Sequence, residues 1–186
     1  MANDSSTGGY LSPVAPSSAP FDASLDAVLQ QVVVGITGIS GSLVRPRWQA
    51  VVPKQPEPGT NWCAIGVSGI EPADYPAEAH DGSGNGSDTQ QAWEGLSVLA
   101  SFYGPDAMAN ASLLKRGLYV AQNREPLQAA GIDVVDAGTI TAAPDLVNQQ
   151  WIRRYDLPIR LRRKVETRYP ILNIASADDL IVTDTH

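Results

Sequence analysis

The most regular pattern of apolar and polar positions in this chain lies in residues 151–168. Apolar side chains take one parity, at Trp151, Tyr155, Leu157, Ile159, Leu161 and Val165. Basic side chains take the other parity, at Arg154, Arg160, Arg162 and Lys164. A period of two predicts a long strand, because successive side chains of a strand point to opposite faces of the sheet. We therefore expect one buried apolar face and one basic face along this strand.

A second pattern, with apolar positions three and four residues apart, predicts a helix over residues 21–38. Its apolar stripe consists of Leu25, Val28, Leu29, Val32 and Ile36. Asp22 or Ser24 suits the N-cap, and Gly38 or Gly41 suits the end of the helix. This is the first regular element that the chain is expected to form.

The same spacing recurs over residues 104–122 and predicts another helix. Pro105 suits its first turn, where the missing N–H leaves no hydrogen bond unmade. Its apolar stripe is Met108, Ala111, Leu114 and Leu118. A short further helix is expected over 123–131, closed by Gly131.

Shorter apolar runs, bounded by Pro, Gly and polar clusters, predict four more strands. They lie at 43–52, 61–70, 91–103 and 132–144. The run 91–103 carries apolar side chains on both parities, which places it near the centre of a sheet. The resulting order, α–β–β–β–α–β–β, predicts an α+β fold with a mainly antiparallel sheet and helices packed on one face.

The two ends of the chain are poor in core-forming residues. We expect an extended N-terminal arm over 1–20, a single domain over 21–172 and a C-terminal arm over 173–186. The C-terminal arm contains one apolar run, Leu180, Ile181 and Val182. A short apolar run of this kind suits addition as a strand to an exposed sheet edge. Both arms are therefore expected to order only against a neighbouring subunit.

The charge of the chain is unevenly distributed. Its formal net charge is −7, from 13 Lys and Arg against 20 Asp and Glu. Seven of the cations lie within 151–168, which leaves that segment at about +5 and the remainder at about −12. Such a strand face favours a negatively charged partner. The alternative is a solvated sheet face on which arginines protect an exposed edge.

Composition also narrows the class of protein. The single cysteine, Cys63, excludes an internal disulfide and, with only two histidines, a Cys/His zinc site. The first twenty residues lack the basic and apolar regions of a signal peptide. No apolar run approaches the roughly 20 residues that span a bilayer. We therefore expect a soluble protein, made in the cytoplasm, with no membrane partner.

No combination of residues predicts catalysis. His80 lies in a long polar loop expected over 71–89, and His186 lies in the C-terminal arm, so neither has the burial that tunes a general base. Residues 81–88 imitate a calcium-binding loop, but Ala92 stands where a bidentate Glu is required. We expect no enzyme, no metal site, no cofactor and no chemistry in the polar loop.

Trp48 is the tryptophan best suited to an interface, because it lies between Arg47 and a Pro-rich connector and because both residue types are enriched at interfaces. Two classes of function then remain, a structural assembly subunit and a nucleic-acid-binding module that uses 151–168. Nucleic-acid binders interleave basic and aromatic side chains. Here Trp151 and Tyr155 share the apolar parity, so we expect them to point into the core.

Five segments occur in an order and spacing that resemble a known family. They are RPRWQ (45–49), NWCAIGV (61–67), SFYGPDA (101–107), GLYVAQNREPL (117–127) and PDLVNQQWIRRYDLPIRLRR (144–163). Together they resemble the phage neck terminator family, the tail-terminator-like proteins of tailed bacteriophages. The resemblance covers residues 25–172 and leaves both arms outside it.

The resemblance implies a structural protein of the virion, made in the host cytoplasm and located in the phage neck. Such proteins form rings, typically hexamers, that terminate the tail tube and join it to the head-to-tail connector around the DNA channel. The implied partners are further copies of the chain, the tail tube protein, the connector or collar protein and the tail sheath, with DNA nearby in the lumen. The predicted interface residues are Arg47, Trp48, Arg154, Arg160, Arg162, Lys164, Leu180, Ile181 and Val182.

Overall fold

The described residues of the chain fall into two compact units. The computed structural model describes residues 3–14, 17, 19–51, 53–72, 75–147 and 149–174. What we call the hairpin unit comprises the described residues within 1–17, 76–91 and 166–186, and the core unit comprises those within 18–75 and 92–165. The sequence pattern did not indicate this division, and the single domain over 21–172 remains a prediction.

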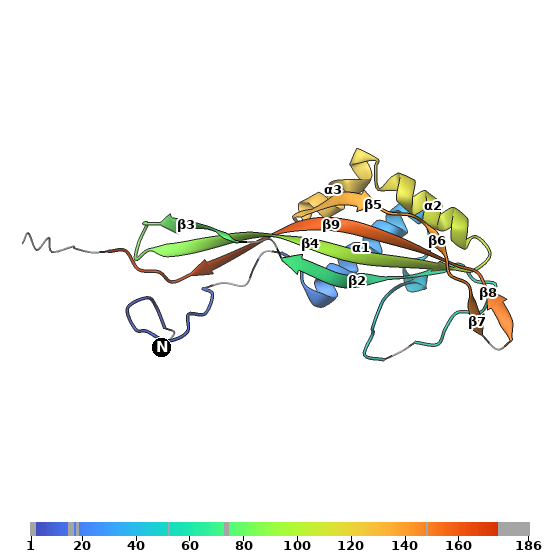
Figure 1. The fold of residues 1–186 in the computed structure, drawn as a ribbon, viewed down its shortest axis with the longest axis horizontal. Coiled ribbons are helices and arrows are strands. Elements are labelled where there is room, and N and C mark those ends of the chain that lie inside the picture. Colours follow the sequence, from blue (N-terminus) through green and yellow to red (C-terminus); the bar gives the residue numbers. More distant parts are fainter. Residues whose placement is uncertain are drawn as a thin grey trace, which may run out of the picture. The chain divides into compact units, whose positions relative to one another are not determined.

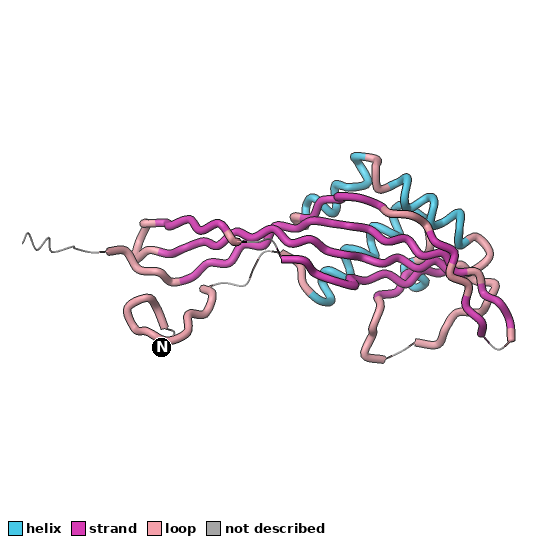
Figure 2. The backbone as a smooth tube through the Cα atoms, viewed as in Figure 1, coloured by secondary structure: helices cyan, strands magenta, loops and turns pink. Residues whose placement is uncertain are grey.

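The core unit is built on a sheet whose strands follow the order β1-β2-β4-β9-β5 (Figures 1 and 2). The strands are β1 Val44–Pro46, β2 Trp62–Pro72, β4 Ser87–Tyr103, β5 Ile132–Ala137 and β9 Arg154–Tyr169. β1 runs parallel to β2, whereas β2 with β4 and β5 with β9 are antiparallel pairs. The predicted α+β class is confirmed, and β4 occupies the middle of the order, as its two apolar parities predicted.

Three short strands lie between β5 and β9. They are β6 Thr141–Ala142, which pairs with β9, and β7 Asp145–Val147 and β8 Gln150–Ile152, which pair with each other. The predicted long strand from 151 therefore begins at 154. Trp151 was expected in the core but is 71% exposed, so that prediction is wrong. The register restarts between β8 and β9, and Ile152 takes the buried position instead.

Three helices cover one face of this sheet, and Figure 1 draws α1 behind the strands. They are α1 Asp22–Thr37, α2 Ala107–Gly117 and α3 Ala121–Ala129; a 3-10 turn, η1 Gly41–Leu43, precedes β1. α1 ends at Gly38 as predicted, where φ is 73°, a conformation that glycine adopts without steric cost. Its N-cap is Phe21, not Asp22 or Ser24, and the Phe21 N–H donates to the Ser24 hydroxyl at 3.0 Å.

The core forms where the apolar parities of the strands meet the helices. Buried side chains include Ile65, Leu96, Val98 and Phe102 from β2 and β4, Leu157, Ile159 and Leu161 from β9, and Leu29, Val33, Leu114 and Leu127 from the helices. The alternation predicted for the basic strand is thus confirmed at its centre. Met108, expected in the stripe of α2, is 59% exposed, and Ala107 is buried in its place.

One charged side chain, Arg163, belongs to the buried side of β9. It is only 1% exposed and pairs with Glu94 of β4 at 2.7 Å. It also donates to the Pro20 carbonyl at 2.6 Å and lies 4.1 Å from the centre of the Phe21 ring. Arg163 therefore fastens the start of α1 to two central strands of the sheet.

The hairpin unit overturns the predicted polar loop over 71–89. β3 Ala77–Asp81 pairs antiparallel with the first residues of β4, from Ser87 to Gln91. All of β3 is exposed. Its apolar positions are only the small residues Ala77 and Ala79, which do not indicate a buried face, so the sequence pattern did not reveal the strand.

The described residues of the N-terminal arm up to residue 17 belong to the same unit and form hydrogen bonds with their own chain. The Val14 N–H donates to the Arg168 carbonyl at 2.8 Å, and the Ser5 N–H donates to the Pro170 carbonyl at 3.2 Å. The Leu172 N–H in turn donates to the Ser5 hydroxyl at 2.8 Å. The expectation that this arm needs a neighbour is therefore wrong for these contacts. Residues 180–182 lie outside the described residues.

Candidate interaction surface

Four side chains form a row across the sheet face that the helices leave uncovered, which we call the open face. Arg45 of β1 lies 5.9 Å from the ring centre of Trp62 on β2. Trp62 stacks on Tyr103 of β4, with ring centres 4.1 Å apart and planes 6° from parallel. Arg154 of β9 lies 5.7 Å from the Tyr103 ring. Two cations thus enclose a pair of aromatic rings, an arrangement that ring quadrupoles favour.

Carboxylates hold the Arg154 end of this row in place. Both oxygens of Asp156 accept hydrogen bonds from the Arg154 guanidinium at 2.8 Å, and Asp145 lies 3.3 Å from it. Burial raises the pKa of Asp156, but the hydrogen bonds from Arg154 and Ser101 outweigh it, so this pKa is lowered overall. The hydrogen bond to Asp156 likewise raises the pKa of Arg154. Both groups are therefore charged at neutral pH.

Arg47 and Trp48 follow β1 directly, and the structure places them beside the same row. The Arg47 guanidinium donates to the Ser101 hydroxyl and to the Leu99 carbonyl, so it is tied to β4. Trp48 is 73% exposed, with its ring 5.9 Å from that guanidinium. Its φ of 54° lies in the left-handed region, which a strand does not use, and β1 has already ended at Pro46. The strand predicted over 43–52 is accordingly only three residues long.

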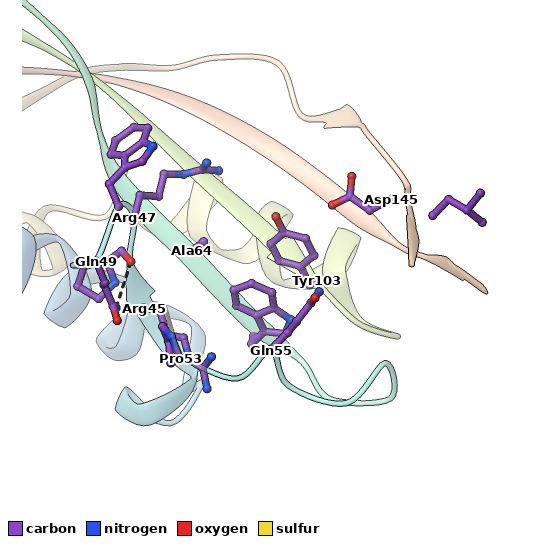
Figure 3. A pocket seen from close by; sticks show the side chains of 12 residues that line it. Arg45, Arg47, Gln49, Pro53, Gln55, Ala64, Tyr103 and Asp145 are labelled. Atoms are coloured by element: carbon purple, nitrogen blue, oxygen red, sulfur yellow. Dashed lines mark hydrogen bonds between the residues drawn. The ribbon is translucent and has the colours of Figure 1, made fainter. Parts of the chain in front are cut away.

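These side chains surround a hollow of about 530 Å³ on the open face (Figure 3). Its lining residues are Arg45, Pro46, Arg47, Trp48, Gln49, Pro53, Gln55, Trp62, Ala64, Tyr103, Asp145 and Leu146. Figure 3 shows Tyr103 and Ala64 on the floor and Arg45 and Arg47 at the side. The walls are mostly aromatic, aliphatic and guanidinium groups, a composition enriched at protein interfaces.

The two arginines of the hollow are bound by neutral groups. Arg45 donates to the Lys54 and Ser42 carbonyls, and Arg47 donates to a carbonyl and a hydroxyl. The ion pairs found among the described residues include neither of them. The hollow is therefore positively charged on this side, within a protein whose net charge is −7.

A family model described as phage neck terminator protein matches residues 23–185. The match extends over both units. The chain belongs to the phage neck terminator family. A comparison with curated proteins finds no match.

As a neck terminator, the chain is a structural component of the bacteriophage neck, and therefore of the virion. The family implies contacts with other head and tail proteins of the phage. The match also includes most of residues 173–186, so the expectation that the C-terminal arm lies outside the family pattern is wrong. Among the described residues, no helix is long and apolar enough to cross a membrane.

The basic strand of the neck terminator is less positive than its sequence suggests. Arg154, Arg163 and Arg168 pair with Asp156, Glu94 and Asp81 of the same chain, at 2.8, 2.7 and 3.4 Å. Arg160 lies 3.9 Å from Asp136 of β5. Asp156 is already counted in the surplus of about +5 along the strand, and part of that surplus is offset by Glu94, Asp81 and Asp136, which the sheet brings close.

The predicted interface residues divide into two groups on the core unit. Arg47, Trp48 and Arg154 meet at or beside the hollow. Arg160 and Arg162 lie further along β9 on the open face, where Arg162 stacks 4.5 Å above the Trp93 ring. Lys164 follows on the same parity and is half-buried.

Sequence reasoning missed three members of the row and a carboxylate beside it. Arg45, Trp62, Tyr103 and Asp145 come from four separate segments, and each appeared only as a member of a strand or motif. The antiparallel register that sets Trp62 opposite Tyr103 is not written in either segment. Each of the four lies in one of the segments that carry the family resemblance. That resemblance was the sequence feature that could have identified them as site residues.

His80 is a structural link within the hairpin unit. Its Nδ1 lies 2.5 Å from an Asp88 carboxylate oxygen, and its Nε2 lies 2.9 Å from the Asn173 side-chain oxygen. The hydrogen bond to Asp88, followed by that to Asn173, raises the pKa of His80.

The chain's cysteine lies in the core unit. Burial raises the pKa of the Cys63 thiol, which is fully enclosed in the core. Among the described residues, no cluster of three or more potential ligands could hold a metal ion.

We expect the hairpin unit to loosen as pH rises through the pKa of His80. Because the folded pKa is raised, the stabilisation is complete below the ordinary value of about 6.5 and disappears above the folded value. An NMR titration should give His80 a pKa above the ordinary value of about 6.5. Asp88→Asn should lower the pKa of His80 and speed amide exchange at Asn173. An unchanged pKa in that variant would contradict the assignment.

Proposed function

We propose that the chain is a ring-forming subunit, typically in six copies, that terminates the tail tube and joins it to the head-to-tail connector around the DNA channel. The observation that carries the proposal is the match to the neck terminator family over residues 23–185, nearly the whole chain. The role needs binding surfaces and correct geometry and uses no catalytic group. The open face and its hollow supply a surface of the required composition.

The partners of this ring are, in our proposal, the tail tube protein on one side and the connector or collar protein on the other. Contact with a tail sheath would follow if the tail is contractile. The exposed Arg160 and Arg162 contribute to the contact with one of these partners, because cations at the rim of an interface steer a negatively charged partner at short range. In a closed ring their field is repeated at each subunit.

The ion pairs of β9 disfavour the second candidate, a nucleic-acid-binding module. Arg154 and Arg168 each have a carboxylate partner in the same chain, and Arg163 is buried. A surface that binds phosphates by counterion release needs cations that are free to approach them. Proximity to DNA in the channel requires no such binding.

Electron microscopy of phage particles tests the proposal. A chain carrying an N-terminal tag should be found by tag-specific gold labelling at the junction of head and tail, and averaged images should show a closed ring there. Six-fold symmetry is the expected result. Labelling elsewhere on the particle, or absence of the chain from purified particles, would overturn the proposed role.

A further inference from the structure

We propose that the hollow of the open face receives residues 175–186 of a neighbouring copy of the chain. The apolar run 180–182 would lie against the aromatic rings, and the aspartates of the segment would lie beside Arg45 and Arg47. This inference rests on the proposed function, because the ring supplies the neighbouring copy.

The receiving surface has an apolar wall that is open to solvent. Trp48 is 73% exposed and Leu146 is 60% exposed, although both are large apolar side chains that gain free energy when they are buried. The stacked Trp62 and Tyr103 rings are already fixed by their register in the sheet, so they need no rearrangement to form a binding site. A segment with a short apolar run fits this wall.

The charge of the hollow selects an acidic occupant. Arg45 is held by carbonyl oxygens, so a carboxylate of an incoming segment can approach a guanidinium that the described ion pairs leave uncompensated. Such charge-assisted hydrogen bonds are about twice as strong as neutral ones. Arg47 is linked through the Ser101 hydroxyl to Asp156, so its charge is offset in part. Asp145 at the rim binds Arg154, which Asp156 also binds, so the charge of Asp145 is offset only in part.

Residues 175–186, ASADDLIVTDTH, match both properties. The segment contains Asp178, Asp179 and Asp184, no Lys or Arg, and three consecutive apolar residues at 180–182. Twelve residues span up to about 40 Å when extended, more than the roughly 30 Å diameter of a small domain, so the segment is long enough to reach a neighbour. Elsewhere in the chain, acidic stretches such as 71–81 lack a comparable apolar run.

A binding experiment with a peptide tests the inference. A fluorescein-labelled peptide of residues 175–186 is titrated with the full-length chain, and its fluorescence anisotropy is recorded. We expect saturable binding that weakens about tenfold with Arg45→Glu, because attraction at contact distance becomes repulsion. Trp48→Ala should weaken it by a similar factor. Arg47 is left unchanged, because its hydrogen bonds to β4 also support the fold.

Trp93→Ala is the matched control, since Trp93 also lies on the open face beneath an arginine but does not line the hollow. It should leave peptide binding within about twofold of the unchanged chain. A peptide with asparagine at 178, 179 and 184 should bind more weakly. Absence of binding, or equal binding to the Arg45→Glu and Trp93→Ala chains, would overturn the inference.

Disulfide trapping decides whether the segment comes from a neighbour. Chains with Gln55→Cys and chains with Val182→Cys are mixed and oxidised; Cys63 is buried and does not interfere. We expect a disulfide-linked pair of chains, and none when Gln128→Cys replaces Gln55→Cys. A chain that carries both substitutions is oxidised separately. If a disulfide forms only within that chain and never between the mixed chains, the segment does not come from a neighbouring copy. If particles show the ring but the peptide does not bind, this inference alone is refuted. If particles show no ring, the proposed function is refuted.

Discussion

Replacing Arg160 and Arg162 by glutamate should lower the yield of joined particles by at least about a hundredfold, while the isolated chain still folds. Each substitution reverses a charge on the open face, so a six-membered ring would change by about 24 unit charges. The Arg160 side chain is 70% exposed, and its ion pair with Asp136 is 3.9 Å long. Such a surface pair contributes at most about 1 kcal/mol to folding.

The measurement is infectious titre together with counts of unjoined heads and tails. Lys54→Glu with Arg116→Glu is the matched control, because it changes net charge equally at two other exposed cations. Normal joining of heads to tails in the variant with glutamate at 160 and 162 would show that Arg160 and Arg162 do not contribute to the interface. Loss of folding, as measured by circular dichroism, would instead show that the two arginines have a structural role.

The largest effect on stability is expected at the buried pair of Glu94 and Arg163. Glu94→Met should destabilise the chain by about 3–5 kcal/mol, because the Arg163 guanidinium, 1% exposed, keeps its charge without a carboxylate. Arg163→Met should cost less, since the Glu94 side chain is 21% exposed and water can reach it. The double substitution should be less damaging than Glu94→Met alone, because no isolated charge remains buried.

Urea unfolding of the three variants measures this cycle. Arg162→Met is the neighbouring control; its exposed contact with Trp93 contributes about 0.5–1 kcal/mol. Equal costs for Glu94→Met and Arg162→Met would show that the pair does not hold the start of α1 against the sheet.

The sequence determined the elements whose patterns are local. The alternation at 157, 159 and 161 and the helical spacing from Leu25 to Val32 each follow from the geometry of one element that packs on one core, and both are confirmed. The two apolar parities of 91–103 likewise predicted the central strand. The five family segments predicted a neck terminator, which the family match confirms.

Only the tertiary structure decided which charges and rings meet. Glu94 allows Arg163 to be buried, because sheet register brings together residues that lie 69 positions apart in the chain. The sequence pattern gives the number of charges in a segment but not which of them lie close together in the fold. The hairpin at β3 escaped for a related reason. Its ladder hydrogen bonds are made by the backbone, and because all of β3 is exposed, no large apolar side chain marks the strand in the sequence.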